Sequence, residues 1–269
     1  PLILGHGREC LRRNAYMISY NFYKNLIYSM PLLVFSLFSA FSGQTVYDIY
    51  MLQIFNVVFT SMPIFVYAVL DWERPKADLV AQPELYRVGM RRHNLTCTRF
   101  SAWLNEAVFH GLLIFALCFV YYNSALSEAG FTADMRMEGN LAYASTVVAV
   151  TLKVLFDSHC VNFWVIASAL FSIGSYFGVA VAMSHISWLD LSGETQELAQ
   201  FGFLPWLVIV MCAFGLYPFT KMYWGFKNLL VDAEVEEPLG KVNLVAREVE
   251  QKFAGESLSP QKQCKWWSR

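Results

Sequence analysis

The stretch from 160 to 184, CVNFWVIASALFSIGSYFGVAVAMS, runs for 25 residues without an acidic or basic side chain. A helix needs about 20 mostly apolar residues to cross a hydrocarbon layer roughly 30 Å thick. This stretch therefore predicts a transmembrane helix, and it guides the interpretation of the rest of the chain.

Five other stretches have the same character. The six expected spans cover approximately 16–40, 47–70, 100–122, 141–157, 160–184 and 202–222. Only a few polar residues separate the fourth span from the fifth, so this pair is expected to form a tight helical hairpin. We expect an all-α fold, an integral membrane bundle of six helices over residues 16–222. A short segment, 1–15, precedes the bundle and a tail, 223–269, follows it.

The composition supports a membrane protein. Of the 269 residues, 56% are hydrophobic and only 15% are charged, whereas soluble domains carry about 25% charged residues. The mean hydropathy is +0.39. These values argue against a soluble enzyme and against a disordered chain. The net charge of −1 gives no electrostatic reason to expect nucleic-acid binding.

The basic residues indicate an orientation. Seventeen of the 20 Lys and Arg residues lie before the first span, in the connection 71–99, or from Lys221 onward. Cytosolic loops of membrane proteins carry the excess of Lys and Arg. We therefore expect both termini and the 71–99 loop to be cytosolic. The loops around 41–47, 123–140 and 185–201 are expected to be exoplasmic.

Lys24 is the clearest polar feature inside a span. An ionisable side chain at membrane depth is costly and suggests a function. Other polar residues lie on its helical face or on the neighbouring stripe: Tyr20, Asn21, Asn25, Tyr28 and Ser29. Such a band is expected to face other helices or a wet groove. The alternative is that Lys24 extends to the cytosolic interface.

The second span offers a polar counterpart. Asn56 and Thr60 share a helical face, and Pro63 frees a backbone carbonyl near Phe59 because proline has no N–H. Interrupted helices with polar side chains at mid-depth form substrate sites in transporters. Interhelical hydrogen bonds that only hold two helices together are the other interpretation.

Two further polar pairs are interpreted as structural. Glu106 and His110 are four residues apart in the third span, and a metal site would need more ligands than these. Lys153 and Asp157 have the same spacing in the fourth span and suggest an ion pair at a helix end. The sequence contains no Walker A loop, GxSxG, HExxH or phosphorylatable Asp motif, so no catalytic or metal-binding residue is expected in this chain.

Several motifs then occur in a recognisable order. They are FYKN at 22–25, FSGQTVYD at 41–48, NVVFTSMP at 56–63, PELY at 83–86 with Gly89, and the spaced residues Trp103, Ala107 and His110. This pattern closely resembles the C-terminal membrane region of type IV P-type ATPases, the phospholipid flippases. The resemblance is strong over residues 1–125 and looser beyond them.

The resemblance implies roles for individual residues. Lys24 and Asn25 match a Lys-Asn pair that the family links to handling of the lipid head group, and Asn56 matches a polar residue lining the same site. An ammonium group and amides suit a phosphate-bearing head group. The residues and the resemblance together predict a head-group path formed by Asn21, Lys24, Asn25, Tyr28, Asn56 and Thr60.

The resemblance also implies a larger protein. The chain corresponds to the last six of ten spans, and residues 1–15 to the link from a phosphorylation domain. ATP, magnesium and the phosphorylated Asp would belong to the missing part, so this chain alone is expected to be inactive, whether natural fragment or truncation. A two-span accessory subunit is an expected partner, in the plasma membrane or an endomembrane of a eukaryotic cell.

Other classes of transporter remain as alternatives. A stand-alone six-span secondary transporter or channel would show internal repeats, and residues 16–122 and 141–222 show no convincing similarity. A cation-pumping P-type ATPase would carry several acidic residues at mid-membrane. In the first two expected spans the only acidic residue is Asp48, at the exoplasmic edge. A scaffold without transport activity is a further alternative.

Overall fold

The fold is known from a computed structural model, which describes residues 2–73, 95–124, 135–185, 205–212, 214–217, 220–222 and 225. The chain divides into two units, Pro1–Pro218 and Phe219–Arg269. The bundle described here belongs to the first unit, and its described elements are all helical. The motifs at 83–86 and at Gly89, and nearly all of the expected tail, lie outside the described residues.

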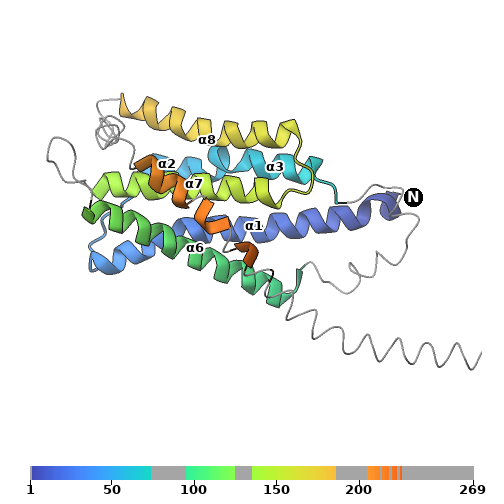
Figure 1. The fold of residues 1–269 in the computed structure, drawn as a ribbon, viewed down its shortest axis with the longest axis horizontal. Helices are drawn as coiled ribbons and strands as arrows, with labels where there is room; N and C mark the ends of the chain where they lie inside the picture. The colour runs from blue at the N-terminus through green and yellow to red at the C-terminus, as the bar shows by residue number, and fades with distance from the viewer. Residues whose placement is uncertain are drawn as a thin grey trace, which may run out of the picture. The chain divides into compact units, whose positions relative to one another are not determined.

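Helix α1 spans Leu2–Phe38 and α2 spans Ile49–Ile54. A π-helix, η1, follows at Phe55–Phe59, and α3 covers Ser61–Leu70. The remaining long helices are α6 at Cys97–Ser124, α7 at Met135–Asp157 and α8 at Phe163–Ser184 (Figure 1). The segment 1–15, which was expected as a link, is thus helical from residue 2 and continuous with the first span.

Within the described residues, five helices are long and apolar enough to cross a membrane. They are Ile49–Leu70, Cys97–Tyr121, Met135–Asp157, Phe163–Ser184 and Pro205–Met222. The helical membrane bundle is therefore confirmed. That α1 crosses the membrane stays a prediction, because the polar residues around Lys24 make this helix less apolar than the other five. Helix α7 begins several residues before its expected start, and residues 158–162 form the expected short connection to α8.

Helix α7 lies at the centre of the bundle. It contacts α1, α3, α6 and α8, which surround it in Figure 1. Of its most apolar stretch of 18 residues, 72% is buried inside the protein, whereas the corresponding share is 33–39% for the other candidate spans. Because protein covers so much of its surface, α7 can carry polar side chains without exposing them to lipid.

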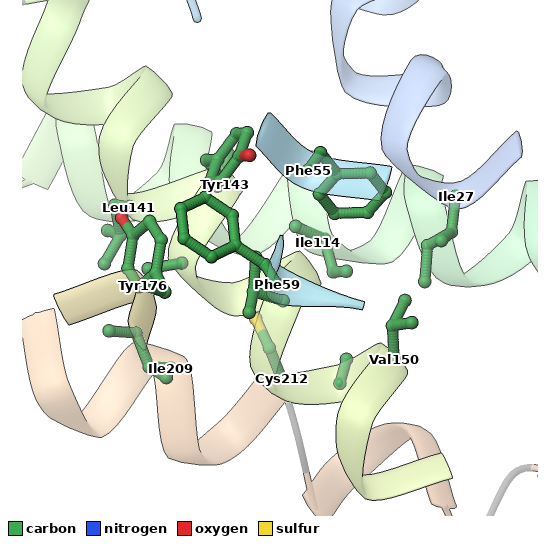
Figure 2. Close-up of a cluster of buried hydrophobic side chains, with 14 of the residues drawn as sticks. Ile27, Phe55, Phe59, Ile114, Leu141, Tyr143, Val150, Tyr176, Ile209 and Cys212 are labelled. Carbon is green, nitrogen blue, oxygen red and sulfur yellow. The ribbon is translucent and has the colours of Figure 1, made fainter. Parts of the chain in front are cut away.

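Aromatic rings fill the core beside η1 (Figure 2). The Tyr143 ring of α7 lies 5.8 Å from Phe55 and stacks on Tyr176 of α8 at 5.5 Å between ring centroids. Phe59 meets Tyr176 edge-on at 5.5 Å. The Tyr143 hydroxyl donates to the Met51 carbonyl at 2.7 Å, so the buried hydroxyl is paired as buried polar groups generally are.

Two glycines allow the chain to pack at close range. A β-carbon on Gly111 of α6 would overlap the Met30 side chain of α1, and a β-carbon on Gly139 of α7 would overlap the backbone of Val46. Small residues at such contacts let membrane helices approach closely. Helix α6 is consequently packed tightly along α1, and the connection after α1 is held against α7.

Candidate functional site

Lys24 and Thr60 are in direct contact inside the bundle. The Lys24 ammonium donates to Thr60 Oγ1 at 3.1 Å, and only 5% of Lys24 and none of Thr60 is exposed. Lys24 is therefore buried against the broken second span, and its ammonium does not extend to an interface. The hydrogen bond joins α1 to the C-terminal end of η1.

The π-helix explains why Thr60 is available to Lys24. The Thr60 N–H donates to the Phe55 carbonyl at 3.2 Å, and its hydroxyl donates to the same oxygen at 3.0 Å. Single-turn π-helices are rare and occur frequently at functional sites. The Thr60 oxygen can accept from Lys24 because its own proton is directed at the backbone.

The carbonyl that Pro63 was expected to free is the one on Phe59. In an α-helix this oxygen would pair with the N–H of residue 63, which proline lacks. The hydroxyl of Ser172 on α8 donates to it instead. The interruption of the second span is thus compensated by a side chain from another helix, as buried backbone groups require.

The remaining predicted site residues lie around this contact. Tyr28 stacks on Phe55 with ring centroids 4.4 Å apart. Asn21 donates to the Met17 carbonyl of its own helix at 2.9 Å. Asn25 and Asn56 are exposed, and their amides form no hydrogen bond to any residue in the described part of the chain. The structure thus brings Lys24 and Thr60 together but does not join the two asparagines to them.

A second polar network lies beside Lys24 between α1, α6 and α7. The Lys153 ammonium forms an ion pair with Glu106, and it also lies 3.7 Å from Asp157. The expected pair with Asp157 is therefore present, but a nearer partner comes from another helix. Lys153 also lies over the rings of Trp103 and Tyr23, 4.5 and 4.8 Å from their centroids. Cation–π contacts of this kind are stronger where water is excluded.

Tyr23 connects this network to the helix that carries Lys24. Its hydroxyl lies 2.7 Å from His110 Nδ1. Their spacing in the sequence suggested that His110 interacts with Glu106. In the structure, His110 is instead in hydrogen-bond contact with Tyr23, and Glu106 forms an ion pair with Lys153. The interpretation of these groups as structural polar contacts is retained, with different partners.

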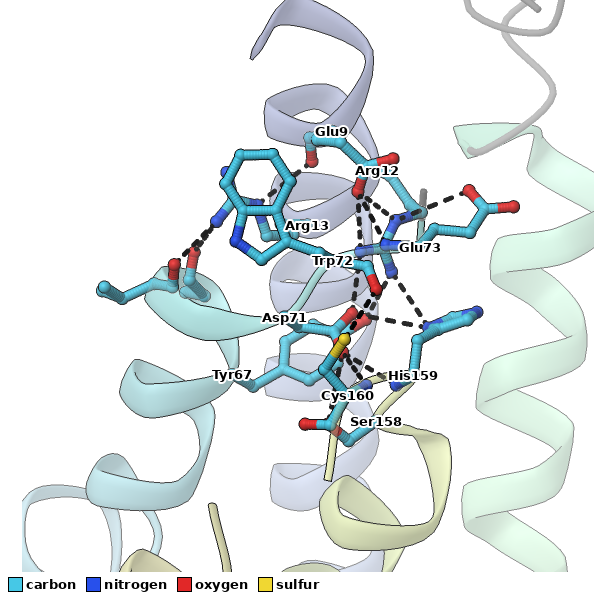
Figure 3. A network of polar contacts seen from close by, with 12 residues as sticks. Glu9, Arg12, Arg13, Tyr67, Asp71, Trp72, Glu73, Ser158, His159 and Cys160 are labelled. Carbon is cyan, nitrogen blue, oxygen red and sulfur yellow. Dashed lines mark hydrogen bonds and ion pairs between the residues drawn. The ribbon is translucent and has the colours of Figure 1, made fainter. Parts of the chain in front are cut away.

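A third network, centred on Asp71, closes one end of the bundle (Figure 3). Asp71 follows α3, and its Oδ2 accepts from Arg12 Nη2 at 2.7 Å. Its Oδ1 accepts from the backbone N–H groups of His159 and Cys160, at 2.7 and 3.1 Å, and from the Ser158 hydroxyl at 3.2 Å. One carboxylate therefore ties α1 and α3 to the turn between α7 and α8.

The environment of Asp71 favours its charged form. Burial alone would raise the pKa of this carboxyl, but hydrogen bonds from His159, Arg12 and Cys160 outweigh burial and hold the pKa well below its usual range. The same contact with Asp71 raises the pKa of His159, against the opposing effects of burial and of the Arg12 charge. We name the set Arg12, Asp71, Ser158, His159 and Cys160 the Asp71 clasp.

Comparison with known proteins shows the family. Residues 1–230 match the family described as phospholipid-translocating P-type ATPase C-terminal. The chain belongs to this family. The family assignment agrees with the resemblance that the motifs at 22–25 and 56–63 carry.

Similar proteins have corresponding names. The chain is 34% identical over 154 residues to the probable phospholipid-transporting ATPase 4 of Arabidopsis thaliana, covering 57% of this chain and 13% of that protein. It is 30% identical over 230 residues to phospholipid-transporting ATPase tat-1 of Caenorhabditis elegans, covering 83% and 20%. Phospholipid-transporting ATPase 6 of Arabidopsis thaliana is 26% identical over 239 residues, covering 88% and 17%. The chain thus spans about a fifth or less of the length of these curated relatives.

The sequence did not reveal two residues that the structure shows to be important: Asp71, the centre of the Asp71 clasp, and Ser172, the partner of the Phe59 carbonyl. Asp71 is the first charged residue after an apolar run, and that position was a usable signal for a residue at a helix end. Ser172 gave no signal, because serine is common in membrane helices and usually bonds within its own helix.

Proposed function

We propose that this chain is the membrane-embedded C-terminal part of an ATP-driven flippase that moves phospholipid from the exoplasmic to the cytosolic leaflet. The proposed head-group path comprises Asn21, Lys24, Asn25, Tyr28, Asn56 and Thr60. ATP hydrolysis, with its magnesium ion, belongs to the part of the protein outside this chain. A two-span accessory subunit is the proposed partner.

The observation that carries this proposal is the buried bond between Lys24 and Thr60. The ammonium is inside the bundle with a neutral hydroxyl as its hydrogen-bond acceptor. A phosphate oxygen is a stronger partner, because its negative charge adds attraction between opposite charges to the hydrogen bond. A lipid phosphate that reaches this position can therefore take the ammonium from Thr60.

The exposed amides supply further contacts for a head group. Asn25 follows Lys24 directly on α1, and Asn56 lies in η1. Each amide offers two donors and an acceptor, which suits the phosphate and ester oxygens of a lipid. The head group would follow these polar side chains while the acyl tails remain in the surrounding lipid.

The proposed orientation places the Asp71 clasp in the cytosol, as the basic residues of the sequence predict. Helix α1 runs from Leu2 to Phe38 without interruption. Movement of a phosphorylation domain attached before residue 2 would therefore reach Lys24 through one continuous helix. The Lys24–Thr60 contact is where that movement would act on the lipid.

The test uses the full-length ATPase that carries this region, purified and assayed for phospholipid-stimulated ATP hydrolysis. Lys24→Met removes the ammonium, and we expect the lipid concentration for half-maximal stimulation to rise by about tenfold or more, the cost of a charged hydrogen bond. Asn56→Ala should also weaken the response, whereas Gln53→Ala, an exposed amide one turn earlier, should not. Unchanged lipid stimulation in both Lys24→Met and Asn56→Ala would refute the path.

A further inference from the structure

Ser172 lies on α8, far from the predicted head-group path in sequence. It is fully buried, and its hydroxyl donates to the Phe59 carbonyl at the end of η1. Thr151 of α7 lies behind it, with Thr151 Oγ1 and Ser172 Oγ 3.0 Å apart. Because a hydroxyl has one proton and that of Ser172 is directed at Phe59, the Thr151 hydroxyl is the donor in this pair.

The contact acts on the segment that supplies Thr60. Phe59 immediately precedes Thr60, and Pro63 leaves the Phe59 carbonyl without its ordinary α-helical partner. The hydroxyls of Thr151 and Ser172 therefore form a buried chain that ends on the backbone one residue from the acceptor of Lys24. An unpaired carbonyl at this depth would cost more than the bond itself contributes, so η1 needs this partner.

We infer that Ser172 is a positioning residue for lipid transport, with Thr151 as its support. It fixes η1 so that Thr60 meets Lys24, and it acts from a helix that bears none of the predicted path residues. This inference rests on the proposed function, because Thr60 matters for transport only if Lys24 binds the head group.

Neighbouring serines show that the arrangement is particular to Ser172. Ser168 lies one turn earlier on the same helix and is also buried, and its hydroxyl donates to Val165 of its own helix at 2.8 Å. Ser175 likewise donates to the Ser172 carbonyl at 2.8 Å. Ser168 is thus a matched control, because it is also buried and its hydroxyl proton is directed at a carbonyl of its own helix.

The experiment compares Ser172→Val with Ser172→Thr in the full-length ATPase. Valine and threonine have side chains of nearly the same shape, but only threonine keeps a hydroxyl at position 172. We expect Ser172→Val to raise the lipid concentration for half-maximal stimulation by about fivefold, with a smaller change in the maximal rate. Ser172→Thr should restore the wild-type value. Ser168→Val should remain close to wild type.

Two further measurements separate positioning from general damage. Deuterium uptake by the peptide covering residues 55–70 should increase in Ser172→Val and not in Ser168→Val, because η1 loses its external partner. In a Thr60→Val background, Ser172→Val should add little to the loss of lipid response, because both variants disturb the same contact.

The possible outcomes distinguish this inference from the proposed function. If Lys24→Met weakens the lipid response as expected while Ser172→Val behaves like Ser168→Val, the proposed path is supported and the proposed role of Ser172 is wrong. Equal defects in Ser172→Val and Ser172→Thr also overturn it, because the hydroxyl would then be irrelevant. Failure of the proposed function itself would appear as a normal lipid response in both Lys24→Met and Asn56→Ala.

Discussion

The Arg12 guanidinium donates to the Asp71 carboxylate at 2.7 Å and joins residues that are 59 positions apart in the chain. The Asp71 side chain is fully buried, and only 13% of the Arg12 side chain is exposed. Arg12 lies on α1, which also carries Lys24, and Thr60 and Asp71 flank the two ends of α3. The Asp71 clasp therefore sets the spacing of α1 and α3 at one end, and the Lys24–Thr60 bond sets it further along.

Removing the charge of Asp71 should destabilise the protein strongly. Asp71→Ala leaves the Arg12 charge without this partner and removes the acceptor of two backbone N–H groups at 159 and 160. Breaking one side of a buried ion pair costs about 3–5 kcal/mol, and a value at the lower end is expected because Arg12 also reaches Glu9. Thermal unfolding of the purified full-length protein measures the effect.

Glu73→Gln is the control for this prediction. Glu73 pairs with Arg8 at 2.9 Å, but 29% of its side chain is exposed. Ion pairs near the surface contribute about 0–1 kcal/mol, so the melting temperature of Glu73→Gln should differ little from wild type. Equal shifts in Asp71→Ala and Glu73→Gln would show that Asp71 is not the centre of the network.

The clasp should depend on pH through His159. Contact with Asp71 raises the pKa of His159, so the protonated ring stabilises the clasp at low pH, and this contribution is lost as the pH rises through the raised value. Asp71 remains ionised throughout, because its pKa is held low. Among the described residues, Arg12 and Glu73 also act on the ring through their charges: Arg12 lowers the pKa of His159 and Glu73 raises it.

The measurement is the melting temperature of wild type and His159→Gln at several pH values. The advantage of wild type should be greater near pH 6 than near pH 8, and it should be small, because half of the His159 side chain is exposed. A difference that is constant with pH would mean that the ring contributes no charge to the clasp.

Replacing Gly111 by alanine should disturb the contact between α1 and α6. Its β-carbon would overlap Met30, and the nearby Ile27 carbonyl would lie at 3.1 Å. Overpacking of this kind costs about 1–3 kcal/mol. Gly174→Ala on α8 is the control, because a β-carbon there has no neighbour within 4 Å. Unfolding of the two variants should therefore differ, and equal stability would contradict the close packing.

The pair formed by Glu106 and Lys153 should show strong coupling. Lys153→Met alone leaves the buried Glu106 carboxylate without its ion-pair partner and should lower the free energy of unfolding by about 3–5 kcal/mol. Adding Glu106→Leu should recover much of this loss in stability. A double-mutant cycle on thermal unfolding measures the coupling. Additive losses in the double variant would show that the two charges do not depend on each other.

Much of the helical bundle followed from apolar length alone, since about 20 apolar residues have few alternatives to a membrane helix. Lys24 and Thr60 were recognisable as site candidates because polar groups at membrane depth are costly. Their contact was not predictable, because it depends on how α1 packs against η1. Periodicity offers only neighbours within one helix, so it paired Lys153 with Asp157 and could not find Glu106 on α6.

The central position of α7 has a consequence for how the chain enters the membrane. Thr151 forms a hydrogen bond with Ser172 on α8, and Lys153 forms an ion pair with Glu106 on α6. If α7 stood alone in the membrane, the side chains of Thr151 and Lys153 would lie against hydrocarbon. Glu106 precedes α7 in the chain, so Lys153 has its partner as soon as α7 inserts, whereas Thr151 meets Ser172 only once α8 is made. The short turn at 158–162 allows α7 and α8 to insert as one hairpin, so that each helix shields the other during synthesis.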